Sequence, residues 1–253
     1  MSRLVALTTI LAVLAVLLLA AAPFGWRAGL WHYRISFELI AGADLLALIA
    51  GIAALLCLAV GRRRLGRRAT VAALCVVLVG AAFALMSWQT WQRRGPPIHD
   101  ITTDTDHPPA IVAALAARQA EHAATADYGG TSLAQQQKEA YPDIAPLVLS
   151  QPPARAYDLA LATATAMPGW HILATDAPAG RIEATQASFW FGFTDDIVIR
   201  VSAEGVGSRV DMRSLSRQGR GDLGVNAARV RAYLAALKQK AGASEERAPI
   251  TQN

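Results

Sequence analysis

Cysteine is nearly absent from this chain of 253 residues. The two cysteines, Cys57 and Cys75, both lie in long apolar segments near the start of the chain. The rest of the chain therefore has no disulfide, no thiol nucleophile and no cysteine metal ligand. Its stability must come from a hydrophobic core, and about 155 residues are enough for one domain with such a core.

Short catalytic motifs are also missing. The sequence contains no G-x-S-x-G elbow, S-x-x-K pair, H-E-x-x-H helix or phosphate-binding P-loop. The histidines after residue 95 are not spaced with an acid and a serine as a catalytic triad requires; they are His99, His107, His122 and His171. These absences favour a non-enzymatic protein, and we expect no cofactor.

Acidic residues are scarce in the first 95 residues, which hold ten arginines against Glu38 and Asp44 and carry a net charge of +8. Of the 24 basic and 19 acidic side chains in the chain, 14 and 17 remain for the other 158 residues, a net charge of −3. A nucleic-acid-binding domain is itself basic. The charge distribution therefore excludes nucleic acid as a partner.

Three apolar segments are present instead, at residues 4–22, 39–60 and 69–88. Each is long enough to cross roughly 30 Å of hydrocarbon, which takes about 20 apolar residues. The sequence therefore predicts a three-span membrane anchor over residues 1–95. The first segment also resembles a signal peptide, because it follows Arg3 and ends in small residues at 20–22, but it is longer than a usual signal-peptide core.

An arginine cluster at residues 61–68 separates the second and third spans. Short arginine-rich loops stay on the cytoplasmic side, which places the N-terminus inside and everything after Trp88 outside. Aromatic residues at 26–33 and 88–91 agree, since they fall at the outer interface under this orientation. The C-terminal part is therefore expected outside the cytoplasm, with membrane lipids as its nearest partners.

Two features of the second span have a predicted role. Ala43, Ala47 and Gly51 form a stripe of small residues at four-residue spacing, which allows close packing between membrane helices. Asp44 is an ionisable group near the hydrocarbon and a functional candidate by default. The simpler interpretation, which we favour, is that the span begins later and Asp44 is interfacial.

The pattern after residue 95 predicts an α+β domain over residues 96–241, followed by a flexible polar tail over 242–253. Prolines predict an extended stretch at 95–109, and helices are expected at 109–126, at 132–140 from a capping box of Ser132 and Gln135, and after Pro153. Alternating residues predict a four-stranded antiparallel sheet with one buried face, at 170–175, 181–190, 196–203 and 208–217. On its polar face, Arg200, Arg209 and Arg213 are expected to pair with Glu183 and Asp211. A last amphipathic helix at 223–240 is expected to cover the apolar face.

Several phrases in this domain resemble one family. They are PPIHDITTD at 96–104, YPD at 141–143, WFGFTDD at 190–196, SLSR at 214–217 and GDLGVN at 221–226. In this order, after a third span, they resemble the bacterial family catalogued as domain of unknown function 1499. The resemblance implies a protein of the bacterial cell envelope, here in the inner membrane with a periplasmic domain, and it transfers no catalytic residue.

One loop has the composition of a metal site. His99, Asp104 and His107 are the candidate ligands within nine residues that also hold two further aspartates. The alternative, a polar loop in which aspartates form side-chain turns, fits better, because the spacing matches no known metal motif.

The glycines at 219, 221 and 224 match the dinucleotide-binding motif G-x-G-x-x-G. A dinucleotide fold needs a buried parallel strand before the motif and a second strand after the helix, whereas here the strand is amphipathic and the chain ends soon after the helix. We therefore expect no bound nucleotide. We expect a tight turn in which Asp222 or Asn226 caps the helix, and backbone amides flanked by Arg217 and Arg220 that hold an anion. Trp190 and Phe191 belong to an aromatic run that places rings on both faces of a strand, so that one ring remains to contact a ligand.

Two hypotheses from different classes follow. The first is a non-enzymatic envelope protein that binds a protein partner or a lipid-like or anionic ligand through the aromatic run and the turn at 217–226. The second is a metal-dependent hydrolase built on the loop at 99–107. The motif arguments favour the first.

Overall fold

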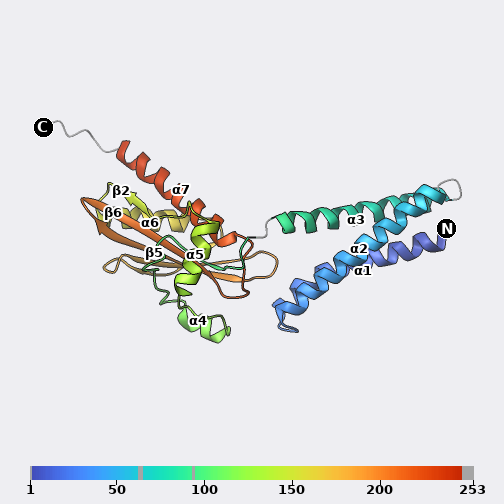
Figure 1. Ribbon diagram of the computed structural model, residues 1–253, viewed down its shortest axis with the longest axis horizontal. Helices are drawn as coiled ribbons and strands as arrows, with labels where there is room; N and C mark the ends of the chain where they lie inside the picture. Colours follow the sequence, from blue (N-terminus) through green and yellow to red (C-terminus); the bar gives the residue numbers. More distant parts are fainter. Residues whose placement is uncertain (1, 62–64, 93–94, 247–253) are drawn as a thin grey trace. The chain divides into compact units, whose positions relative to one another are not determined.

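The computed structural model describes residues 2–61, 65–92 and 95–246 (Figure 1). The chain divides into two compact units, residues 1–93 and 94–253. The first unit consists of helices and the second is α+β, as the sequence predicts.

The first unit contains α1 (Ser2–Arg27), α2 (Tyr33–Gly61) and α3 (Arg67–Gln92), all long and apolar enough to cross a membrane. Each extends several residues beyond the predicted span. The small-residue stripe of α2 is buried, and a Cβ atom added at Gly51 would lie 3.1 Å from the Cα of Gly80 on α3. Small residues therefore let α2 and α3 approach backbone to backbone, as expected. Arg62, Arg63 and Arg64 of the arginine cluster lie outside the described residues.

The second unit is built on an antiparallel sheet of six strands, not the four expected. The strands are β1 (Asp100–Thr102), β2 (Leu147–Leu149), β3 (Trp170–Asp176), β4 (Arg181–Ala187), β5 (Thr194–Glu204) and β6 (Gly207–Ser216). Their order is β1-β6-β5-β4-β3, and β2 pairs with another part of β6. The two missed strands have three residues each, which is too short for a recognisable alternation. One of them, β1, lies in the stretch at 95–109, which was expected to be extended but not to pair in the sheet.

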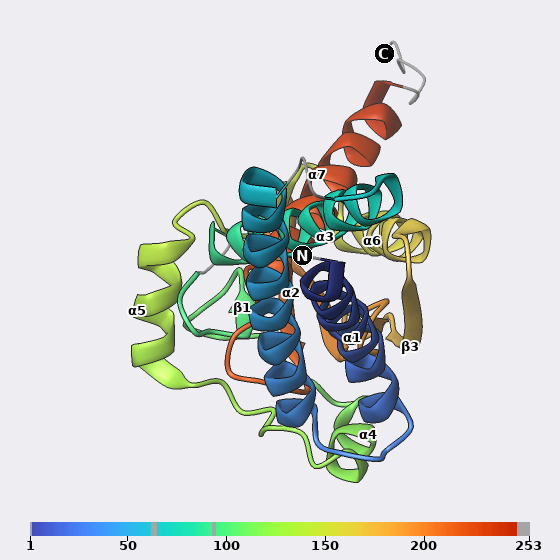
Figure 2. The ribbon, with the colours of Figure 1, turned by 90° about the vertical axis from the view of Figure 1, so that its right-hand side faces the viewer.

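One face of the sheet packs against α6 (Pro153–Ala166) and α7 (Val225–Glu246), which lie together over it in Figures 1 and 2. The core between them is apolar: Ile182, Ile197, Ile199, Val210 and Met212 from the sheet meet Tyr157, Ala160, Val230, Tyr233 and Leu237 from the helices. The Trp170 ring of β3 stacks on Tyr233 with 5.4 Å between centroids. We call this the helical face; the prediction that the last helix covers it is confirmed. That helix continues to Glu246, through the first residues of the expected tail, and residues 247–253 lie outside the described part.

The opposite face was expected to be exposed, and this prediction is wrong. It is covered by residues 103–126, and Val198 and Leu215 are buried there against Ile111 and Ala114. Most of its other side chains are charged. We call it the charged face and define it by Asp100, Glu183, Asp196, Arg200, Asp211, Arg213 and Arg217.

The covering segment also corrects a helix prediction. In place of a helix over 109–126, the structure has only α4 (Leu115–Ala120), which Figures 1 and 2 place away from α6 and α7. The reason is tertiary: the carboxylate of Glu183 accepts hydrogen bonds from the backbone N–H groups of Val112, Ala113 and Ala114, at 2.8 to 3.3 Å. The backbone N–H groups of these three residues are therefore bound to a side chain of β4, and the helix begins only at the next residue, Leu115. The next helix, α5 (Gly130–Ala140), starts two residues before Ser132, and its N-cap Gly129 makes no capping-box contact.

Candidate functional site

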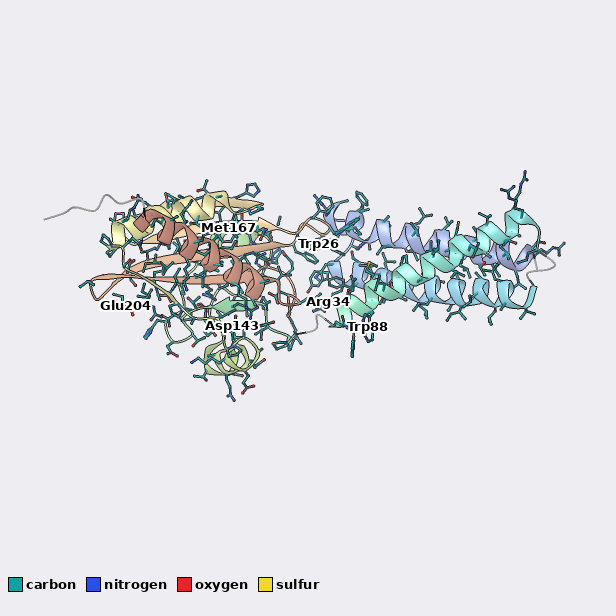
Figure 3. The ribbon with its side chains drawn as sticks, turned by 90° about the horizontal axis from the view of Figure 1, so that it is seen from above. Trp26, Arg34, Trp88, Asp143, Met167 and Glu204 are labelled. Carbon is teal, nitrogen blue, oxygen red and sulfur yellow. The ribbon has the colours of Figure 1, made fainter. Side chains whose placement is uncertain are left out.

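Three segments meet at one end of the sheet. Strands β1 and β5 both run antiparallel to β6, so both begin at the end where β6 finishes. Hydrogen bonds join the segments there: Ser216 N–H donates to the His99 carbonyl at 3.0 Å, and Arg217 N–H donates to the Thr194 carbonyl at 2.9 Å. We call this the aromatic end; it comprises residues 95–99, 188–193 and 217–225. The opposite end carries the β5–β6 turn, near Glu204 in Figure 3.

The aromatic run forms a hairpin loop at this end. Strand β4 ends at Ala187, so the expectation that these rings occupy two faces of one strand is wrong. Phe191 and Phe193 stack on each other with centroids 4.9 Å apart and are partly buried. Trp190 is 66% exposed and meets the ring of Phe189 edge to face. Of the two predicted ligand residues in the loop, Trp190 is therefore the accessible one.

Arg217 does not hold an exposed anion site. Its side chain is 5% exposed, and its guanidinium binds the Asp196 carboxylate at 2.7 Å and also Glu121. Burial lowers its pKa, but the hydrogen bonds and charges of Asp196 and Glu121 together outweigh burial, and the net shift of the pKa is upward. The guanidinium of Arg217 is thus fully occupied by ion pairs of the charged face.

The turn before α7 caps that helix, as predicted. One Asp222 carboxylate oxygen accepts from the backbone N–H of Gly224 at 2.9 Å and the other from that of Asn226 at 2.6 Å. The Asn226 side chain is fully buried and donates to the His99 carbonyl at 2.9 Å. Both residues therefore hold the turn in place. The backbone N–H groups of Gly224 and Asn226 are already bound to Asp222 and are not free for a ligand.

A pocket of about 440 Å³ opens at the aromatic end. It is lined by residues 97–100, by the turn at 124–129, by two residues of α5, and by Leu215 and Arg220. We call it the Arg220 pocket. Arg220 is exposed and has no ion-pair partner among the described residues, in contrast to Arg217. The acid Asp127 is also exposed at the rim, and the apolar residues Ile98 and Leu133 line the wall.

The candidate metal ligands are not brought together. Asp104 binds Arg200 at 2.9 Å and accepts from the backbone N–H of His107 at 2.9 Å. Burial raises the Asp104 pKa, but these hydrogen bonds outweigh it and lower the pKa overall. His99 lies at the aromatic end, where its Nδ1 is buried without a hydrogen-bond partner among residues 2–61, 65–92 and 95–246. Within those residues no three metal-ligating side chains form a group, and the metal site stays a prediction.

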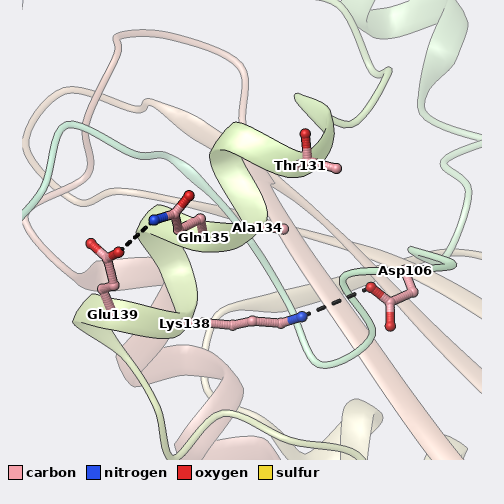
Figure 4. A pocket seen from close by; sticks show the side chains of 6 residues that line it. All are labelled: Asp106, Thr131, Ala134, Gln135, Lys138 and Glu139. Carbon is pink, nitrogen blue, oxygen red and sulfur yellow. Dashed lines mark hydrogen bonds and ion pairs between the residues drawn. The ribbon is translucent and has the colours of Figure 1, made fainter.

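A second hollow, shown in Figure 4, lies beside α5 and is lined mainly by residues with polar or charged side chains. Lys138 and Asp106 face each other across it with 3.8 Å between Nζ and the carboxylate, and both are more than half exposed. Exposed pairs of this kind contribute little binding or stability. This hollow serves as a control surface below.

The sequence did not reveal the ion pairs of the charged face that centre on Asp196 and Asp100. Asp196, 1% exposed, binds Arg118 and Arg217 together, each at 2.7 Å. Arg213 makes a two-pronged bond with Asp100, at 2.9 and 2.7 Å, and lies over the ring of Tyr128, whose burial, followed by the Asp100 charge, raises its pKa to about 12. Arg200 and Arg209 pair with Asp211, as expected, but Glu183 binds backbone amides and Arg181. The arginine partners of Asp196 and Asp100 lie 21 to 113 residues from them in the chain, so no local motif could reveal these pairs.

Asp44, a candidate intramembrane acid for which we favoured an interfacial position, lies within α2. Its Oδ2 accepts a hydrogen bond of 2.8 Å from the hydroxyl of Ser87 on α3. The carboxylate therefore faces the neighbouring helix, which is the arrangement typical of polar residues in membrane bundles.

Comparison with known proteins gives a family and no activity. The family described as "Protein of unknown function (DUF1499)" matches residues 100–237. The crystal structure of TTHA0849 from Thermus thermophilus is similar at 13% identity and a TM-score of 0.26, over 40% of this chain and 96% of that one. The curated proteins yield no match.

Proposed function

Because the chain belongs to the DUF1499 family, which brings no known chemistry with it, we propose a function from the geometry alone. The protein is a non-enzymatic membrane-anchored protein of the bacterial cell envelope, and its second unit binds the phosphate-bearing headgroup of an amphiphilic ligand. The Arg220 pocket supports this proposal best. It combines an uncommitted guanidinium with an apolar wall at the end of the sheet where the chain arrives from the membrane spans.

The chemistry of the pocket favours a phospholipid headgroup over a free anion. Arg220 and the imidazole of His99 provide hydrogen-bond donors for a phosphate. Asp127 at the rim disfavours a ligand that is only anionic and favours one that also carries an ammonium group. Ile98 and Leu133 offer apolar contact for the first methylene groups of a chain. Phosphatidylethanolamine has all three features.

Native mass spectrometry of the full-length protein released from mild detergent tests this function. We expect phosphatidylethanolamine adducts that decrease several-fold in Arg220→Ala. Lys138→Ala is the matched control, because it removes an exposed cation beside the hollow in Figure 4. Equal lipid retention in both variants would contradict the proposal, and a stoichiometric divalent metal lost in His99→Ala would favour the hydrolase hypothesis instead.

The proposed location is the inner membrane, with the N-terminus in the cytoplasm and the second unit in the periplasm. The arginine-rich loop between the second and third spans supports this orientation. Val206 lies in the β5–β6 turn and is fully exposed, so Val206→Cys provides a labelling site that the fold tolerates. We expect a membrane-impermeant maleimide to label this variant in cells with a permeabilised outer membrane. Labelling only after lysis of the inner membrane would reverse the orientation.

A further inference from the structure

Exposed apolar side chains gather at the aromatic end from two segments that are distant in the sequence. Trp190 in the β4–β5 loop is 66% exposed; Leu223, before α7, and Val225, its first residue, are 51% and 50% exposed. Phe189, next to Trp190, projects from the same loop. Apolar groups exposed on a soluble domain mark contact with a partner or a membrane when they share one part of its surface, and these side chains share one end of the sheet.

The backbone holds Leu223 in a strained conformation. Its φ angle is +55°, in the left-handed region that non-glycine residues rarely adopt. The Asp222 carboxylate binds the backbone N–H groups on the far side of Leu223 and so fixes the turn. The strained turn keeps an apolar side chain in solvent, although burial would be its favoured state.

The covalent chain determines what this surface can reach. Only two residues, 93 and 94, separate Gln92 at the end of α3 from Gly95 at the aromatic end. Three Cα–Cα steps span at most about 11 Å. The last turns of α3 carry Trp88 and Trp91, both more than half exposed, and such rings settle at the membrane–water interface. Gly95, the first residue of the aromatic end, is therefore tied by the chain to within about 11 Å of the last residue of the third helix.

We propose that the loop at 188–193 and the turn at 222–225 dock on the membrane, with Trp190 and Leu223 inserted into the interfacial layer of the phospholipid. A tryptophan and aliphatic side chains are the groups that this layer accepts. Docking is independent of the pocket ligand, because it uses side chains that do not line the Arg220 pocket.

The two ends of β5 supply a matched test. Strand β5 has 11 residues and runs about 33 Å from the aromatic end to the turn that carries Val206. Both native cysteines lie in α2 and α3, so the background is Cys57→Ala with Cys75→Ala. A nitroxide label is attached in Trp190→Cys, in Leu223→Cys or, as the control, in Val206→Cys. The full-length protein is then placed in nanodiscs of phosphatidylethanolamine and phosphatidylglycerol.

Electron paramagnetic resonance then measures the collision rates of each label with oxygen, which partitions into lipid, and with a water-soluble nickel chelate. We expect the oxygen-to-nickel ratio to be several-fold higher at positions 190 and 223 than at 206. Equal ratios at both ends would overturn the proposal. Low collision rates with both reagents at 190 and 223 would also overturn it, because they indicate a protein contact instead of lipid. Adding Arg220→Ala separates docking from the proposed function, since lipid adducts should decrease while the label depth is retained.

Discussion

The sheet of the second unit has two buried faces, and each is covered in a different way. On the helical face, α6 and α7 pack branched and aromatic side chains against Ile197 and Ile199. On the charged face, an irregular segment is held mainly by arginine–carboxylate pairs around Asp196 and Asp100. Hydrophobic packing is non-directional and tolerates repacking, whereas buried ion pairs require both partners in place. The charged residues that look functional in the sequence are therefore mostly structural, and ligand contacts are to be sought at the end of the sheet.

The largest expected effect on stability comes from removing Asp196, the central acid of the charged face. Asp196→Ala leaves Arg118 and Arg217 buried without their shared carboxylate, and we expect a loss of about 3–5 kcal/mol in the free energy of unfolding. Denaturant unfolding of the full-length protein in detergent measures it. The control is Asp143→Ala, which removes an exposed partner of Arg231 and should cost less than about 1 kcal/mol. Similar losses for the two variants would mean that the charged face does not stabilise the fold.

Changes that conserve volume sharpen the contrast. Ile199→Ala on the helical face should cost about 2–5 kcal/mol, but Ile199→Leu less than about 1.5 kcal/mol, because the core can repack. Asp196→Asn also conserves volume, yet it should cost more than about 2 kcal/mol since the charge is lost. The same unfolding experiment compares them. A costly Ile199→Leu together with a tolerated Asp196→Asn would reverse the assignment of the two faces.

The smallest expected effect is on the free energy of unfolding at acid pH. The Asp104 pKa lies below its usual value of 3.8, so the folded state binds a proton less readily than the unfolded state. Asp104 therefore stabilises the fold above the unfolded pKa, and this contribution is lost as the pH falls through the folded pKa. We expect the unfolding free energy of the wild type to fall more steeply below about pH 4 than that of Asp104→Asn. Parallel acid profiles would show that Asp104 contributes nothing through its arginine contacts.

Where sequence reasoning succeeded, the signal was local and periodic. Apolar length predicted α1 to α3, alternation predicted β3 to β6, and the prolines at 152 and 153 marked the start of α6. Sequence reasoning failed where a contact between residues far apart in the chain determines the local structure. Glu183 binds amide groups 69 to 71 residues earlier in the chain, and this contact replaces the helix that the composition of 109–126 favours.

The same limit applies to the site. Trp190 was identified because an aromatic run is visible in the sequence, although its place in a loop was not. Arg217 and Arg220 look alike in the sequence, three residues apart beside a glycine-rich turn. Only the fold distinguishes them, because Asp196, which binds Arg217, comes from a neighbouring strand.

These two arginines provide the most direct test of the account, which assigns the charged face to the fold and the aromatic end to binding. Unfolding free energy and retained phospholipid should be measured together for Arg217→Ala and Arg220→Ala. We predict that Arg217→Ala loses about 3 kcal/mol or more of stability, and that Arg220→Ala stays within about 0.5 kcal/mol of the wild type while its lipid adducts decrease several-fold. A stable Arg217→Ala that loses lipid, beside an Arg220→Ala that retains it, would contradict the account.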